Sequence, residues 1–200
     1  MSSKALPPDI DPISRCRLPL PKREELDEAG KKVYDHHVTP GGQSLAGLNG
    51  PGGIRLHSPT LSVLQSPPSK YLRWEAGLSG QIRELIIIVT AREMGSEFEW
   101  FQHEGEAIKE GVPRAIVDAV KFRKPLDGIP ETEATIIAFG RELIGKHKVS
   151  SETFARALKL FGKRTLVDIV SLMGNYTSTA LLLAAFDAHL PEGQEPSLPK

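Results

Sequence analysis

The segment SEFEWFQH, residues 96–103, places three side chains that could do chemistry at helical spacing. In a helix, Ser96, Glu99 and His103 fall within an arc of about 60°, because successive residues turn by ~100°. Imidazole and carboxylate groups are the usual agents of general acid–base catalysis. The same spacing also fits a structural role, a Ser-x-x-Glu capping box followed by an i,i+4 side-chain pair. The segment alone leaves both interpretations open.

Glu84 adds a second carboxylate directly before the apolar run LIIIV at 85–89, which predicts a buried helix. At the edge of a dry core a carboxylate needs a partner or takes a raised pKa, and we expect the raised pKa. A turn at Gly95 lets the two helices pack antiparallel. At ~1.5 Å per residue, Glu84 and His103 then lie roughly level across the hairpin. We expect Glu84, Glu99 and His103 to form an acid–base set, with Glu99 holding the imidazole ring.

Further side chains are candidates for binding a substrate at this set, and an anionic substrate would need a cation. For each arginine the alternative is a surface or ion-pair role, and for the histidine it is capping of a loop. The tryptophan is expected in the core or as a wall of the site. The candidates are Arg73, Arg83, Arg55, His57, Ser96 and Trp100.

A metal site is the other use of such ligands. Glu99 and His103 at i,i+4 could supply two ligands and Glu84 a third, but the second histidine of an HExxH motif is missing. We therefore predict no metal and no cofactor.

The stretch RELIIIVTAREMGSEFEWFQHEGEAIKEGV, residues 83–112, resembles the core motif of the carboxymuconolactone decarboxylase family, which shares its fold with the alkylhydroperoxidase AhpD. Redox members of that family carry E-x11-C-x2-C-x3-H across this hairpin. In this sequence Glu84, Ser96, Glu99 and His103 keep the spacing, and both cysteines are replaced. Thiol redox chemistry needs an attacking and a resolving cysteine, so we expect no thiol peroxidase activity.

The phrases at 55–61, 71–79 and 166–186 also resemble longer members, so that the resemblance covers roughly residues 50–190. It implies an AhpD-like helical bundle, a homo-oligomer (trimer or hexamer), and a cofactor-independent lyase or isomerase. Proton transfer in decarboxylation, lactone or isomerisation chemistry on an anionic or lactone-like small molecule is then expected. The alternative is an inactive protein of the same fold that serves as an oligomeric binding or scaffold protein.

The composition limits the other function classes. The chain has 25 basic and 25 acidic residues, so no net charge steers it toward nucleic acid or an anionic membrane. A single cysteine, Cys16, excludes an intramolecular disulfide and any CxxC motif. The first residues lack the apolar region of a signal peptide, and the run at 85–89 is too short to span a bilayer. We expect a soluble cytoplasmic protein without nucleic-acid or membrane partners.

The elements that must position these residues are predicted to be all α-helical, because no window alternates polar and apolar residues over strand length. The Pro67-Pro68 pair is expected to end one helix and precede another. The expected helices are 21–37, 59–64, 69–76, 80–94, 96–110, 113–122, 131–147, 150–162 and 164–190.

The predicted organisation is a proline- and glycine-rich extension over 1–57, a helical domain over 58–190 and a flexible tail over 191–200. The extension holds one helix and a glycine-rich loop, 41–53, that is a surface loop or a lid. That loop lacks a GK[ST] ending, which excludes a P-loop. Apolar residues over 165–186 cover more than one helix face, which predicts burial against another subunit; the alternative is one deep core.

Overall fold

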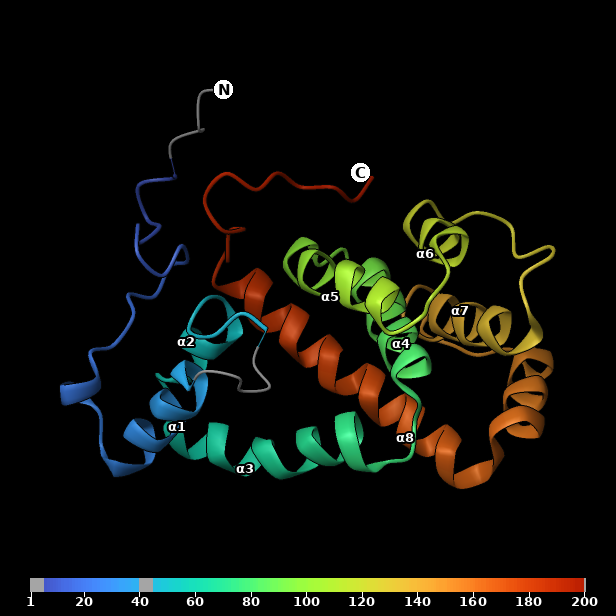
Figure 1. Cartoon of the computed structure of the whole chain (residues 1–200), viewed down its shortest axis with the longest axis horizontal. Helices are drawn as coiled ribbons and strands as arrows, with labels where there is room; N and C mark the ends of the chain where they lie inside the picture. The colour runs from blue at the N-terminus through green and yellow to red at the C-terminus, as the bar shows by residue number, and fades with distance from the viewer. Residues whose placement is uncertain (1–5, 40–44, 200) are drawn as a thin grey trace. The chain divides into compact units, whose positions relative to one another are not determined.

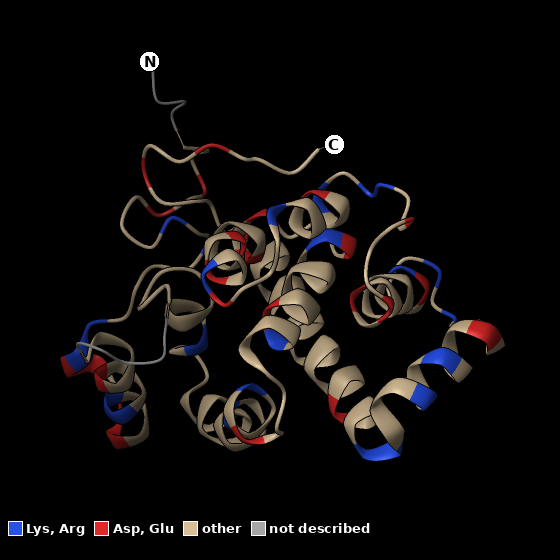
Figure 2. Cartoon of the chain, turned by 45° about the vertical axis from the view of Figure 1, so that its right-hand side comes forward, with Lys and Arg blue, Asp and Glu red and all other residues tan. Residues whose placement is uncertain are grey.

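The computed structural model describes residues 6–39 and 45–199. In these ranges the chain forms eight α-helices and no strand (Figure 1). The predicted all-α class is therefore confirmed. Basic and acidic residues are interspersed along the helices, in keeping with the balanced charge (Figure 2).

The chain divides into two compact units. The first comprises Met1–Pro68 and Leu181–Pro196, and the second comprises Ser69–Ala180 and Ser197–Lys200. The division predicted from the sequence, after residues 57 and 190, stays a prediction.

The first unit contains the 3-10 turn η1 (Arg23–Glu25) and the helices α1 (Glu28–Val38) and α2 (Pro51–Arg55). The single helix predicted from Pro21 is wrong, because Asp27 caps α1: its side chain accepts from the Gly30 N–H at 2.7 Å.

The end of the glycine-rich stretch is also not a loop. Pro51 opens α2 as its first helical residue, where the missing N–H is not needed. The predicted loop begins in residues 41–44, which lie outside the described residues.

Helix α3 (Pro59–Lys70) runs through Pro67 and Pro68, so the predicted break there is wrong. The fixed φ of proline, about −65°, is itself helical, so the chain keeps its direction although two backbone donors are lost. The helix continues as a π-helical turn, η2 (Tyr71–Glu75), in which the Ala76 N–H donates to the Tyr71 carbonyl oxygen at 2.8 Å.

In the second unit α4 (Gly80–Glu93) is the central helix. It contacts α5 (Glu97–Lys109), α6 (Arg114–Lys121) and α7 (Glu131–Leu143), which surround it in Figure 1. Ser79 caps it, accepting from the Ile82 N–H at 3.3 Å. Residues 85–89 are at most 1% exposed, which confirms the predicted core helix.

Helices α4 and α5 form the predicted hairpin. Gly95 has φ 62°, a left-handed conformation that glycine adopts without strain. The Ser96 N–H donates back to the Ala91 carbonyl oxygen at 2.8 Å, which closes the end of α4. The turn sends α5 back along α4 and sets the register between them.

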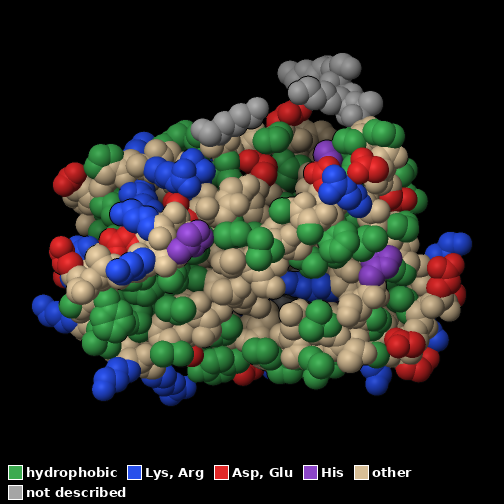
Figure 3. All heavy atoms as spheres, turned by 180° about the vertical axis from the view of Figure 1, so that it is seen from behind, with side chains coloured by type: hydrophobic (Ala, Val, Ile, Leu, Met, Phe, Trp, Pro, Cys, Tyr) green, Lys and Arg blue, Asp and Glu red, His purple; other side chains and the backbone are tan. Residues whose placement is uncertain are grey.

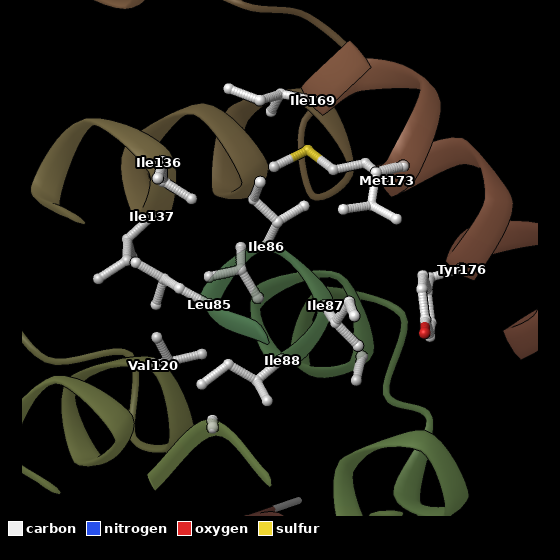
Figure 4. Close-up of a cluster of buried hydrophobic side chains, with 14 of the residues drawn as sticks. Leu85, Ile86, Ile87, Ile88, Val120, Ile136, Ile137, Ile169, Met173 and Tyr176 are labelled. Atoms are coloured by element: carbon white, nitrogen blue, oxygen red, sulfur yellow. The ribbon is translucent and has the colours of Figure 1, made fainter. Parts of the chain in front are cut away.

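Helix α8 (Ser151–Ala185) consists of two segments, because Gly162 has non-helical angles, φ 70° and ψ 171°. Two helices were predicted here, although the second ends at 185 rather than 190. Ile169, Met173 and Tyr176 join the core around α4 (Figure 4).

Between Val167 and Ala185, the exposed side chains of α8 are uncharged, and several of them are apolar. Val167 is 63% exposed and Leu181 58% exposed, and residues 169–186 include no charged side chain. Hydrophobic side chains also reach the surface between charged ones in Figure 3. By length and composition, α8 is the one described helix that could cross a membrane, but half of the relevant window is buried, as in the core helix of a soluble protein.

Candidate functional site

The centre of the site is a bond between the two arms of the hairpin. His103 on α5 lies with Nδ1 2.7 Å from Glu84 Oε2 on α4, and both side chains are at most 5% exposed. Glu99, one turn earlier on α5, is also buried. The structure thus brings Glu84, Glu99 and His103 together, as the hairpin register predicts.

Arg83 holds the second oxygen of Glu84. Its Nε donates to Glu84 Oε1 at 3.1 Å, its Nη1 to the Arg73 carbonyl oxygen at 3.4 Å, and its Nη2 lies 3.4 Å from Glu110 Oε1. The guanidinium also lies over the ring of Trp74, 4.3 Å from its centroid. These contacts make Arg83 a partner that positions Glu84, rather than a free cation for a substrate.

The expected raised pKa of Glu84 is wrong. Burial by itself raises the pKa of this carboxyl. The hydrogen bond and charge of His103, together with those of Arg83, lower the pKa by more than burial raises it, so the pKa lies below its ordinary value. The effect of burial is outweighed here because both His103 and Arg83 contact the carboxylate. Glu84 is therefore ionised at neutral pH and accepts the Nδ1–H of His103.

Glu99 has a different role from the one predicted. Its Oε2 lies 3.7 Å from His103 Nε2, too far for a direct hydrogen bond. Glu84, not Glu99, therefore holds the imidazole ring. Glu99 instead adds a negative charge beside Nε2, the ring nitrogen of His103 that does not contact Glu84.

The capping box predicted for Ser96 and Glu99 does not form. Ser96 is the N-cap residue of α5, but its side chain accepts no capping hydrogen bond. The Ser96 N–H donates to Ala91, and the carboxylate of Glu99 lies near His103. Because the Ser96 N–H and the Glu99 carboxylate both have neighbours other than each other, the capping interpretation of this segment is wrong.

Tyr176 is a site residue that the sequence did not single out. Its ring meets His103 edge to face, at 5.2 Å between centroids and an interplanar angle of 86°. It is 6% exposed, and burial strongly raises the pKa of its phenol, against which the charges of Arg73 and Arg83 act. The phenol is therefore neutral. The one feature of the sequence that could have pointed to Tyr176 is that it is the single tyrosine in residues 169–186, a stretch without charged residues.

Arg73 lies on the π-helical turn η2. Its Nε is buried and has no hydrogen-bond partner among the described residues. The guanidinium lies 4.8 Å from the ring centroid of Trp74. Of the charged groups that act on Tyr176, Arg73 has the largest effect on the pKa of the phenol.

The other predicted binding residues are Arg55, His57 and Trp100. Arg55 and His57 belong to the first unit, where His57 Nε2 lies 2.9 Å from the Pro19 carbonyl oxygen. Trp100 is fully buried in the core around α4, with Lys121 Nζ 5.6 Å from its ring centroid. Their roles in binding a substrate stay predictions.

Among residues 6–39 and 45–199, no three His, Cys, Asp or Glu side chains are grouped to hold a metal ion. The expectation that the protein uses no metal or cofactor stays a prediction. Neither the protein-family models nor the curated proteins that were compared with the chain match it.

The arrangement suits proton transfer. A carboxylate that accepts from Nδ1–H fixes the imidazole tautomer and makes Nε2 the basic nitrogen. When Nε2 takes a proton, the imidazolium lies between the carboxylates of Glu84 and Glu99, which stabilise its charge. His103 can therefore act first as a base and then as an acid.

Proposed function

We propose that the protein is a cofactor-independent enzyme that moves a proton to or from carbon in an anionic or lactone-like small molecule. The observation that supports this proposal most strongly is the 2.7 Å contact between the buried side chains of His103 and Glu84. His103 exchanges the proton at Nε2, Glu84 orients the ring, and Glu99 stabilises the imidazolium. Arg73 is the cation for the substrate.

The resemblance of residues 83–112 to the carboxymuconolactone decarboxylase family supports the same chemistry. The AhpD-like motif spacing is kept at Glu84, Glu99 and His103 without its cysteines. Decarboxylation, lactone opening and isomerisation share an enolate-like intermediate, and a base next to a cation and a neutral donor can stabilise one. Lyase or isomerase activity in the cytoplasm is the form we propose.

The second candidate function is that of an inactive oligomeric scaffold, with which the exposed apolar residues of α8 are compatible. Such residues are suited to burial against another copy of the chain, as a trimer or hexamer. An enzyme and a scaffold would both use this interface, so only a catalytic measurement separates them.

The test of the proposed function is carbon-bound deuterium incorporation. Small keto acids, unsaturated dicarboxylates and lactone acids are incubated with the protein in D₂O, and loss of each C–H signal is followed by proton NMR. We expect at least one compound class to exchange faster than in buffer. Exchange at the buffer rate for the whole panel would favour the scaffold.

A further inference from the structure

A short segment late in the chain is held by side chains of α5 and α6. The backbone N–H groups of Ser197 and Leu198 both donate to the carboxylate of Glu97, the first residue of α5, and the bond from Leu198 to Oε2 is 3.0 Å long. Lys121, the last residue of α6, donates from Nζ to the Ser197 hydroxyl at 3.1 Å. The segment belongs to the second unit, as both helices do. Main-chain and side-chain groups of the segment are thus both recognised.

Lys121 is held in position by partners other than this segment. Its side chain is 10% exposed, and its Nζ lies 3.1 Å from Glu104 Oε1 on α5. Its carbonyl oxygen accepts from Arg92 Nε at 2.8 Å. A lysine ammonium has three donors, so Lys121 keeps one for a hydroxyl after it has paired with Glu104. The donor that meets Ser197 is therefore preorganised, which lowers the entropic cost of binding.

The apolar contact of the segment is made by Leu198. This side chain is partly buried and packs against the hydrophobic core around α4, whereas residues 192–197 are exposed. In peptide recognition, main-chain hydrogen bonds supply affinity and side-chain contacts supply specificity. Because the contacts are concentrated at the end of an exposed stretch, the segment can leave the surface without unfolding of a helix.

We infer that this surface of α5 and α6 is a binding site for a short peptide of the sequence Ser-Leu-Pro, and that residues 197–199 of the chain are its occupant. Glu97 binds the main chain of the peptide, and Lys121 binds the serine hydroxyl. The leucine packs against the core of the second unit. The occupant is releasable, and the same sequence supplied as a separate peptide takes its place.

This peptide site is distinct from the candidate acid–base site on the same helix. Glu97 and Glu104 are seven positions apart and share one face of α5. At ~100° per residue, Glu99 and His103 lie about 100–160° away from them around the helix. The inference therefore goes beyond the proposed function and holds whether or not the protein is an enzyme.

The experiment measures binding of a synthetic peptide, QEPSLPK, which copies residues 194–200. The peptide carries a fluorophore at its amino end and an amide at the other, and its anisotropy gives the dissociation constant. Two variants of the whole chain empty the site. Ser197→Pro removes an N–H that donates to Glu97, and Leu198→Ser removes the apolar contact.

The unmodified chain should bind the peptide more weakly than either variant does. A tethered segment competes at an effective concentration on the order of millimolar, so we expect a difference of about 10-fold or more. Glu192→Gln is the matched control, because it changes an exposed residue of the same stretch. It should bind the peptide as weakly as the unmodified chain.

Further changes assign the contacts in the Leu198→Ser chain. Glu97→Ala should weaken binding by about 10-fold, the effect of losing charge-assisted hydrogen bonds. Glu106→Ala is its control on the same helix, since that carboxylate pairs with Lys109 instead, at 3.3 Å. A peptide with alanine in place of the serine should bind about 3–10-fold more weakly, because the partner of Lys121 is lost.

Absence of binding to both emptied variants at millimolar peptide would overturn the inference. Equal affinity for the unmodified chain and for both variants would overturn it too, because the segment would then not occupy the site. Full affinity in Glu97→Ala would place the peptide elsewhere, with the same consequence. Thermal unfolding of each variant checks that the helices are kept.

Discussion

His103 and Glu84 are 19 positions apart in the chain, yet Nδ1 of the imidazole lies 2.7 Å from Oε2 of the carboxylate. The left-handed turn at Gly95 sets this register by returning α5 along α4. Arg83 occupies the other carboxylate oxygen. The contact therefore joins the packing of the hairpin to the protonation of its two central polar groups.

Glu84→Gln should destabilise the fold by roughly 2–4 kcal/mol at pH 7, because it removes the buried carboxylate that both Arg83 and His103 contact directly. The pKa of Glu84 is lowered in the folded protein. Its contribution is therefore complete above the unfolded pKa of ~4.3 and is lost as the pH falls through the lower folded pKa.

The measurement is urea unfolding of both proteins between pH 7 and pH 3. The difference in the free energy of unfolding should shrink only at the acidic end of this range. A difference that is constant with pH would show that the carboxylate charge of Glu84 does not stabilise the fold.

Gly140→Ala should destabilise the second unit by about 1–3 kcal/mol through overpacking. A Cβ at Gly140 on α7 would overlap Cγ1 of Val89 on α4, so the two helices could not keep their approach. Gly174→Ala on α8 is the matched control, since a Cβ there meets nothing within 4 Å.

The control should be neutral or more stable by up to ~1 kcal/mol, from helix propensity alone. Urea denaturation of both variants measures the contrast. Equal stability of the two would mean that α4 and α7 do not pack closely at Gly140.

Much of the fold could be predicted because its signals are local. The apolar run at 85–89 and the glycine at 95 are enough to place α4 and the turn. The continuation of helix α3 through Pro67 and Pro68 could not be predicted, since two consecutive prolines locally favour a helix end, whereas the chain continues through them into η2.

The candidate site could be predicted only in part. Helix spacing and hairpin register bring Glu84, Glu99 and His103 together, and both are readable from the chain. Tyr176 could not be found in this way, because it approaches from α8, 73 positions beyond His103, through tertiary packing. The sign of the pKa shift of Glu84 likewise depends on two partners whose geometry is set by the fold.

The chain should assemble with copies of itself through the exposed apolar residues of α8. Val167 and Val170 are two of these residues, exposed at 63% and 38%. Val167→Lys should weaken the assembly, because it would place a charge in the interface. Light scattering at micromolar concentration measures the mass, and a 21.9 kDa monomer for the unmodified chain would contradict this prediction.

The protein should show no thiol peroxidase activity. Cys16 is the only cysteine in the sequence, and its side chain is buried. Peroxide consumption with a dithiol reductant should equal that of buffer, both for the unmodified chain and for Cys16→Ser. Activity that disappears in Cys16→Ser would show that a single cysteine can support the reaction here.

The most direct test of the central claim is the rate of deuterium incorporation into carbon with His103→Ala, using the compound that exchanges fastest with the unmodified protein. We predict a rate 10²–10⁴-fold lower, about the contribution of one acid–base residue. His147→Asn is the control: it removes an exposed imidazole at φ 55°, a conformation that asparagine tolerates, and should leave the rate unchanged. A His103→Ala protein that is folded and exchanges at the full rate would contradict the account.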